Sequence, residues 1–313
     1  MRKGILSDFS GTEKLGILFV LIIFFTIIFG VIGMFVAYFQ TGIGLNSSQL
    51  SNLNNPNTIL YMKISQIFQA IGLFIIPPII AIITFGKKGE NYLQFNKTKF
   101  LYILAAGSLM LLALPLITWL AEINQSINFP DSLSGVEEWM RINEISATEI
   151  TESFLKTDTI IGLLFNLFIM ALIPAFGEEM LFRGVLQKIF TQMSKNIHIG
   201  IWITAFLFSA IHMQFLTFLP RFFMGAVFGY FLFWSGSIWV PIAAHFVNNA
   251  TAIISNYLYQ NKLIETDLEN LETENQVYYI FLSTLLVGLI LYYLYKGKEK
   301  TQLSRNKDSD SEV

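Results

Sequence analysis

The stretch that decides both the fold and the site is PAFGEEMLFRGVLQKI, from Pro174 to Ile189. It places Glu178, Glu179 and Arg183 inside a run that is otherwise apolar enough to cross a lipid bilayer. A charge at the centre of a bilayer costs about 2.5–3.5 kcal/mol on insertion scales, so it is tolerated where it faces a protein interior and has a partner. The stretch therefore predicts a polar site inside a membrane protein.

Glu179 and Arg183 are spaced to neutralise each other. Residues i and i+4 share one face of a helix, and a glutamate that precedes the basic residue is the favourable order. Glu178 lies about 100° further round the helix and has no cation at that spacing. A buried carboxylate of this kind is suited to act as a general base. The alternative interpretation is a structural ion pair beside a spare acid.

The composition predicts an all-α, polytopic membrane protein. The 313 residues are 54% hydrophobic and 13% charged, whereas soluble domains carry about 25% charged residues. We expect about eight transmembrane helices around a polar cavity, at residues 15–39, 64–85, 100–120, 160–189, 199–212, 216–234, 238–254 and 277–295. Pro174 should kink the fourth helix, and the fifth is short for a full crossing.

We divide the chain into four parts. Residues 1–121 hold N-terminal transmembrane helices, residues 122–159 an extracytoplasmic connection, residues 160–295 a catalytic helical core, and residues 296–313 a disordered cytoplasmic tail. An amphipathic helix on the outer surface is predicted in the connection, and an ordinary loop helix is the alternative. Its apolar and charged residues are Leu133, Val136, Trp139, Met140 and Ile142 with Glu137, Glu138 and Arg141.

Basic residues cluster in alternate connections, which predicts the orientation. They are Arg2, Lys3, Lys14, Lys87, Lys88, Lys97, Lys99, Lys188, Lys195, Lys296, Lys298 and Lys300. The other connections, near residues 122–158 and 265–274, are rich in acids. We expect both termini in the cytoplasm and an integral protein of a bacterial inner membrane. Arg221, near the outer end of the sixth run, is expected to reach the lipid headgroups.

Two function classes are excluded by what the sequence lacks. There is no basic tract with interleaved aromatic residues, so nucleic acid is not an expected partner. There is no cysteine, which excludes disulfides, thiol catalysis and zinc-thiolate sites. His198, His212 and His245 are the only imidazoles.

Four polar groups are predicted to share one depth. At 1.5 Å per residue, Glu178, His245, Asn249 and His212 lie about 10–20 Å from the inner ends of their helices. In a hydrocarbon core about 30 Å thick, such groups satisfy each other only by converging. The expected result is a water-accessible cavity holding a carboxylate, two imidazoles and a carboxamide.

That set of groups suits hydrolysis of an acyl bond by water. The carboxylate takes a proton from water, an imidazole positions the water, and donors stabilise the oxyanion. Ser209, three residues before His212, is the only nearby nucleophile and is not favoured. The alternative for each histidine alone is a hydrogen bond between helices.

The residues also carry a family resemblance. EExxxR at Glu178, Glu179 and Arg183 resembles the first motif of the CAAX-protease and bacteriocin-processing (Abi) family of intramembrane endopeptidases. FxxxH at Phe208 and His212 resembles the second motif, and HxxxN at His245 and Asn249 the third. The three occur in the family's order, within about residues 165–255.

The resemblance implies a fold of about eight helices and a role for each residue. Glu178 would be the general base, and His212 its partner on the catalytic water. His245 and Asn249 would form the oxyanion site, supported by Glu179, Arg183 and Phe208. The partners would be the bilayer and a peptide or protein substrate. Eukaryotic members remove three C-terminal residues from prenylated proteins, but nothing in this sequence indicates a prenylated substrate.

Several alternatives stay open at this stage. Members of the family have been described as metalloproteases, and Glu178, His212 and His245 would be the ligands if zinc were bound. No cofactor is favoured, because the chain has no HExxH motif. A non-catalytic immunity or scaffold protein of the same fold is the second hypothesis. A transporter or proton relay is the third.

Overall fold

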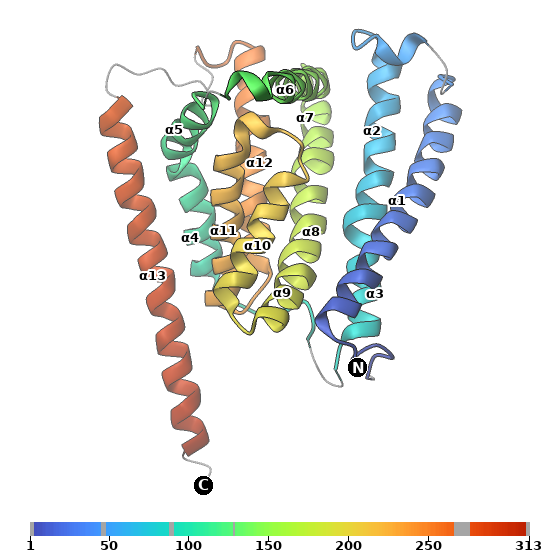
Figure 1. Ribbon diagram of the computed structural model, residues 1–313. Helices are drawn as coiled ribbons and strands as arrows, with labels where there is room; N and C mark the ends of the chain where they lie inside the picture. Colours follow the sequence, from blue (N-terminus) through green and yellow to red (C-terminus); the bar gives the residue numbers. More distant parts are fainter. Residues whose placement is uncertain (1–2, 45–47, 88–90, 128, 266–275, 311–313) are drawn as a thin grey trace.

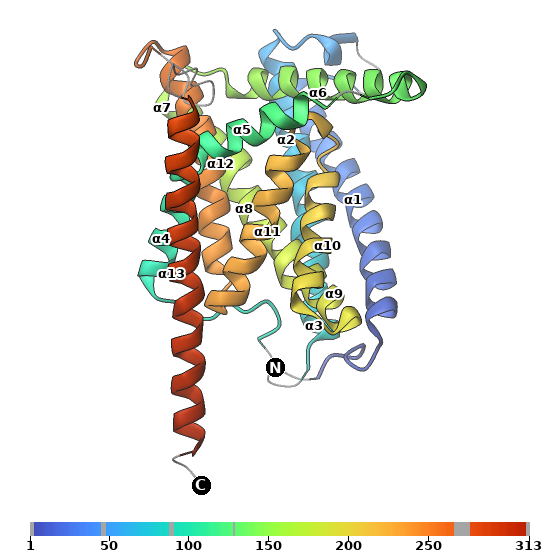
Figure 2. The ribbon, with the colours of Figure 1, turned by 60° about the vertical axis from the view of Figure 1, so that its left-hand side comes forward.

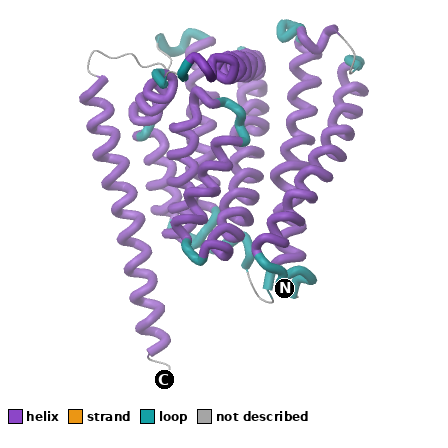
Figure 3. Tube along the Cα trace, in the orientation of Figure 1, coloured by secondary structure: helices purple, strands orange, loops and turns teal. Residues whose placement is uncertain are grey.

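The chain forms a bundle of helices. The structure is a computed structural model that describes residues 3–44, 48–87, 91–127, 129–265 and 276–310. These ranges contain helices and loops and no strand, as Figure 3 shows. The predicted all-α class is confirmed. Arg2, Lys88 and the acidic residues at 267–274, on which the predicted orientation partly depends, lie outside the described residues.

Within the described ranges, five helical stretches are long and apolar enough to cross a membrane. The first is α1 (Gly11–Thr41), and the second joins α2 (Pro56–Ala70), η2 (Ile71–Ile75) and α3 (Ile76–Phe85). The third covers Ile160–Ser194. The fourth, Phe215–Ser235, includes α11 (Phe218–Ser235). The fifth, Gln276–Gly297, is the first part of α13 (Gln276–Asp310). The pair α4 (Phe100–Leu112) and α5 (Leu114–Gln125), bent by 49°, makes a sixth if it is one span.

The predicted number of eight spans is therefore not confirmed. α10 (Ile197–Ala210) is apolar but has only 14 residues. α12 (Trp239–Gln260) has 22 residues, but the polar residues of the site lie along it and it is not among the five. Both helices nevertheless run through the middle of the bundle beside α11 (Figure 1).

The bundle has a centre and two flanks (Figure 1). α8 (Ile173–Glu179), α10, α11 and α12 form the centre, the α1–α2 pair lies on one side, and α13 lies on the other. The start of α1 and the end of α13 are at the same end of the bundle. That this end faces the cytoplasm stays a prediction.

The predicted amphipathic segment is a helix, α6 (Ser134–Leu155). Figure 2 shows it lying across one end of the bundle, at a steep angle to the helices below it. Its residues Val136, Trp139 and Ile142 are exposed, and Glu137 pairs with Arg141 at 2.8 Å. A helix that lies across the end of a bundle and exposes an apolar face is typical of a membrane interface.

A buried lysine joins the flanking helices to the centre. Lys63 of α2 donates to the carbonyl oxygen of Phe154 in α6 and to Oδ1 of Asn166 in α7 (Ile160–Asn166), both at 2.8 Å. These hydrogen bonds replace the bonds to water that the ammonium group loses on burial. α2 is thereby held to two consecutive helices whose bonded residues lie 91 and 103 positions further along the chain.

The helix that carries the acidic motif contains two wide segments. The π-helices η4 (Leu167–Leu172) and η5 (Met180–Leu186) flank α8, and α9 (Gln187–Ser194) follows. Pro174 was predicted to kink this helix, and it lies directly after η4. The irregularity therefore takes the form of π-helical turns, which are frequent at functional sites.

The end of the chain is also helical. α13 continues to Asp310, so the segment predicted as a disordered tail from residue 296 is helical as far as that residue. Eight of the fifteen residues from 296 to 310 are Lys, Arg, Glu, Gln or Leu, which favour helices. Residues 311–313 lie outside the described residues.

Candidate active site

Glu178, His212 and His245 meet from three separate helical segments. Glu178 Oε2, on α8, lies 4.0 Å from Nε2 of His212, at the end of α10, and 4.0 Å from Nε2 of His245, on α12. The Glu178 side chain is 10% exposed, and its Oε2 has no hydrogen-bond partner among the described residues. The structure thus brings together three of the four groups that depth along the helices predicted to converge, and the fourth, Asn249, lines the same cavity.

Each histidine ring is oriented by a hydrogen bond at its far nitrogen. His212 Nδ1 is 2.7 Å from the carbonyl oxygen of Phe208, and His245 Nδ1 is 2.8 Å from Glu179 Oε1. A carbonyl or carboxylate oxygen accepts, so both Nδ1 atoms carry hydrogens. When each ring is neutral, its Nε2 is then an acceptor that faces Glu178.

Glu179 and Arg183 form the predicted ion pair and extend it to His245. Arg183 Nη1 donates to Glu179 Oε1 at 2.9 Å, and both side chains are fully buried. The same Oε1 accepts from His245, so one carboxylate oxygen serves a guanidinium and an imidazole. The spacing of the motif predicted the ion pair but not the contact with His245.

Phe208 contacts Arg183 of this ion pair and both imidazoles. The Arg183 guanidinium carbon is 4.4 Å from the centre of the Phe208 ring. That ring also meets His212 and His245 edge-on, with centroids 5.1 and 5.8 Å apart. The cation therefore gains a favourable contact with the ring face, and Phe208 packs against both rings of the site.

Two glycines allow α11 to approach the motif helix. The carbonyl oxygen of Gly225 accepts from Arg183 Nη2 at 2.9 Å, and that of Gly229 accepts from Gln187 Nε2 at 3.3 Å. A Cβ on Gly229 would lie only 2.8 Å from both Gln187 Oε1 and Ile201 Cγ2. The small residues that the sequence places four apart thus permit close packing, as they do between membrane helices generally.

Asn249 has a partner that the sequence did not indicate. Its Nδ2 donates to the carbonyl oxygen of Met170 at 3.3 Å. Pro174, four residues after Met170, has no N–H to give that carbonyl, so the amide supplies a donor where the proline cannot. The neighbouring Asn248 donates to Asn249 Oδ1 at 3.1 Å and so orients the amide.

These side chains surround a cavity of about 260 Å³. Its lining contains the predicted residues Glu178, Phe208, His212, His245 and Asn249, and also Met170, Pro174, Arg221, Met224, Phe228 and Asn248. Arg221 was expected to reach lipid headgroups, but it lines the cavity and donates to Gln214 and Thr217. Its position near a helix end gave no signal of this role.

The remaining candidates lie apart from the reacting groups. His198 contacts the Tyr230 hydroxyl at 2.8 Å and does not line the cavity. Ser209 Oγ donates to the carbonyl oxygen of Phe218 at 2.7 Å and is buried. Its hydroxyl therefore connects α10 to α11, and it is not aimed at either histidine.

As they stand, the three converging groups do not fit a zinc ion. Tetrahedral ligands with bonds of about 2.0–2.1 Å lie about 3.3 Å from each other, whereas Glu178 Oε2 is 4.0 Å from each imidazole Nε2. Among the described residues, no group of three histidine, aspartate or glutamate side chains has the arrangement of a metal site. A mechanism without a cofactor stays a prediction.

The fold and the site together define an integral membrane protein of helices with a polar chamber of about 260 Å³ built on a glutamate and two histidines. A family model described as Rce1-like, type II CAAX prenyl endopeptidase Rce1-like, matches residues 160–251. That segment contains every predicted site residue, and the match confirms the resemblance that the three motifs carry. Over this part, the chain is similar to a family of membrane proteases.

A curated relative matches part of the chain. The Bacillus subtilis (strain 168) protein titled "Uncharacterized protein YpbD" is 36% identical over 89 residues, which are 27% of this chain and 42% of the relative. The chain thus spans less than half the length of the curated relative it matches. No solved structure matches the chain.

Proposed function

We propose that this protein is an intramembrane endopeptidase in which Glu178 activates a water molecule to attack a peptide bond. The observation that carries the proposal is the approach of Glu178 Oε2 to both Nε2 atoms at 4.0 Å on the wall of a cavity of about 260 Å³. Two hydrogen bonds of about 2.8 Å that meet at one water span such a distance.

In this proposal, Glu178 is the general base and His212 positions the water. One hydrogen of the water points to Glu178 Oε2 and the other to His212 Nε2, which leaves a lone pair for the carbonyl carbon. Glu178 takes the first proton as the new C–O bond forms. It gives that proton to the amine nitrogen as the C–N bond breaks, so that the products are a carboxylic acid and an amine. Positioned acid–base catalysis of this kind contributes about 10²–10⁴-fold to the rate.

His245 is the proposed donor to the oxyanion. Its Nδ1–H is held by Glu179, and a second proton on Nε2 would point into the cavity beside Glu178. The charges of Glu178 and Glu179 then balance those of Arg183 and the protonated His245. Asn249 adds the second hydrogen of its Nδ2, because the first is given to Met170. One oxyanion donor is commonly worth about 10²–10³ in kcat.

The proposed partner is a peptide or protein with a cleavage site at membrane depth. The name of the matching family makes a prenylated C-terminal peptide the first probe to test. The cavity supports a peptide segment as the substrate, because its lining includes the apolar side chains Met170, Met224 and Phe228 beside the polar ones.

The decisive experiment compares membranes that contain the wild type with membranes that contain Glu178→Gln or His212→Ala. New protein C-termini are mapped by mass spectrometry, and an internally quenched farnesylated peptide is assayed in parallel. We expect at least about 10³-fold slower cleavage in both variants, with unchanged amounts of protein in the membrane. Cleavage by both variants at the wild-type rate would contradict the proposal.

A further inference from the structure

His212 is the least enclosed of the three reacting groups. Its side chain is 27% exposed, against 6% for His245. It lies just beyond the last residue of α10, and Met213 directly after it has a φ of 56°, in the left-handed region. The position of His212 therefore depends on the segment 213–217 that follows, which we call the α10–α11 loop.

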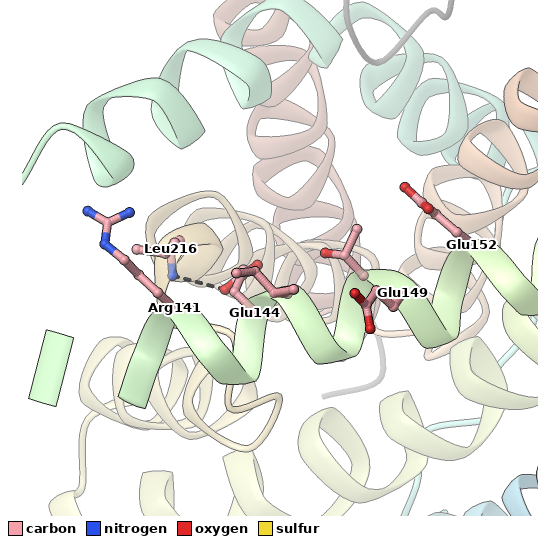
Figure 4. A pocket seen from close by; sticks show the side chains of 7 residues that line it. Arg141, Glu144, Glu149, Glu152 and Leu216 are labelled. Atoms are coloured by element: carbon pink, nitrogen blue, oxygen red, sulfur yellow. Dashed lines mark hydrogen bonds between the residues drawn. The ribbon is translucent and has the colours of Figure 1, made fainter. Parts of the chain in front are cut away.

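Glu144 of the surface helix α6 binds this loop from above. Its Oε2 accepts from the backbone N–H of Leu216 at 3.2 Å, and its Oε1 accepts from the Thr217 hydroxyl at 3.0 Å. Gln214 Nε2 reaches Oε1 at a longer 3.5 Å. Figure 4 shows Glu144 directed at Leu216 from the α6 helix. Bonds to an ionised acceptor are stronger than neutral ones.

Arg221 of α11 holds the same loop from the other side. Its Nη1 donates to Thr217 Oγ1 at 2.6 Å, and its Nη2 donates to Gln214 Oε1 at 2.7 Å. The Thr217 hydroxyl thus accepts from Arg221 and donates to Glu144. The arginine, the threonine and the glutamate form one chain of hydrogen bonds across the loop, and such chains strengthen each member.

A third side chain completes the enclosure. Asn124 of α5 donates to the carbonyl oxygen of Phe215 at 2.9 Å and accepts from the backbone N–H of Leu219 at 2.7 Å. The ring of Phe215 also packs against Trp139 of α6, with centroids 5.6 Å apart. The loop is therefore fixed to two elements outside the motif helices, and α6 supplies both a charge and an aromatic contact.

From these contacts we infer that Glu144 is a positioning residue for His212, and that through it the surface helix α6 sets the geometry of the site. Only the predicted effect on the cleavage rate rests on the proposed function. The predicted effect on the position of His212 does not. Loss of the Glu144 carboxylate frees the Leu216 N–H and the Thr217 hydroxyl. The loop then keeps only its contacts with Arg221, Asn124 and Trp139, so the His212 beside it is held less tightly. The reacting water loses its orientation, while the substrate-binding wall near Met170 is unaffected.

The test uses Glu144→Ala with Glu149→Ala as the matched control. Glu149 is on the same helix and, like Glu144, lines a pocket beside Leu216, but among the described residues no hydrogen bond joins its carboxylate to the loop (Figure 4). Glu144→Gln keeps one oxygen that can accept from Leu216, so it should recover part of the effect.

The first measurement is independent of cleavage. The chain has only three histidines, so a sample labelled with isotopes in histidine gives a small set of ring signals. We expect the His212 signal to shift and broaden in Glu144→Ala and to stay unchanged in Glu149→Ala. His198, bonded to Tyr230, is the internal reference. An unchanged His212 signal in Glu144→Ala would overturn the inference, whether or not the protein proves to be a peptidase.

The second measurement is the rate with the internally quenched farnesylated peptide. Small misplacement of a reacting group can cost about 10²-fold, so we expect kcat to fall at least about tenfold in Glu144→Ala. KM should change less than about twofold, and Glu144→Gln should be intermediate. A moved His212 signal with unchanged kcat would refute the coupling, and a rise in KM alone would refute a positioning role. If the wild type cleaves nothing, the proposed function fails and the histidine spectra still decide the structural claim.

Discussion

Replacement of Arg183 by methionine should destabilise the protein strongly, and a second substitution should restore part of the loss. Arg183→Met removes a cation whose side chain is fully buried together with that of Glu179. It leaves the Glu179 carboxylate with His245 as its remaining partner. Methionine is unbranched and apolar but shorter than arginine, so the change removes the charge and opens only the space of the guanidinium end.

The magnitude follows from the contacts that Arg183 makes. Removing one member of a buried ion pair costs about 3–5 kcal/mol, because the other charge stays buried without compensation. The double variant Glu179→Gln/Arg183→Met has no uncompensated charge, and the glutamine oxygen can still accept from His245. What is left is the unpaired carbonyl of Gly225 and the lost contact with Phe208, about 1–3 kcal/mol together. The double variant should therefore be more stable than Arg183→Met by about 2 kcal/mol.

The assay is unfolding in mixed micelles with increasing SDS, followed by the fluorescence of the five tryptophans. Wild type, both single variants and the double variant complete a cycle whose coupling energy isolates the ion pair. Glu179→Gln alone should also be destabilised, since it leaves Arg183 buried beside a neutral amide. If the double variant were as unstable as Arg183→Met, or more so, the charge would not be the source of the loss.

Three further outcomes are expected. Gly229→Leu should lower the free energy of unfolding by about 1–3 kcal/mol, because its Cβ would lie 2.8 Å from atoms of Gln187 and Ile201. Gly288→Leu is the control, since a Cβ there would have no atom within 4 Å, and it should change the free energy of unfolding by less than about 0.5 kcal/mol in the same assay. Ser209→Ala should keep the rate of peptide cleavage within about tenfold and cost about 1 kcal/mol of stability; a loss of 10³-fold or more would instead make Ser209 a nucleophile. Cleavage should continue at the wild-type rate after dialysis against a strong zinc chelator, and loss of activity that added zinc restores would contradict the metal-free proposal.

The sequence predicted those parts of the site that depend on local spacing. Glu179 and Arg183 pair because i and i+4 share a helix face, and Glu178, with no cation at that spacing, faces away from the pair. Helical depth predicted that Glu178, His212 and His245 would converge, because polar groups in lipid satisfy each other.

Contacts between segments far apart in the chain could not be predicted in this way. Nothing local indicates that His245 binds Glu179 as well as facing Glu178, or that Arg221 turns inward to the cavity. Glu144 lies on a helix whose apolar pattern predicted only its position at a surface. The packing of the helices determines these partners. The periodic patterns of a single sequence do not reveal such contacts between distant segments.

The wide turns of η4 also determine which way Glu178 points. A segment with i→i+5 bonds uses more residues per turn than an α-helix, so over its six residues the following helix is rotated by about 100° relative to an uninterrupted one. That rotation is about the angle between neighbouring residues. Deleting one residue from 167–172 would let the rest of the segment wind as a regular α-helix through almost the same total angle, so Glu178 would keep its direction. Regular winding of all six residues would instead turn the motif by about 100° and bring a different side chain opposite the histidines. The wide turns of η4 thus absorb one surplus residue, and in doing so they set which acid faces the histidines and which pairs with Arg183.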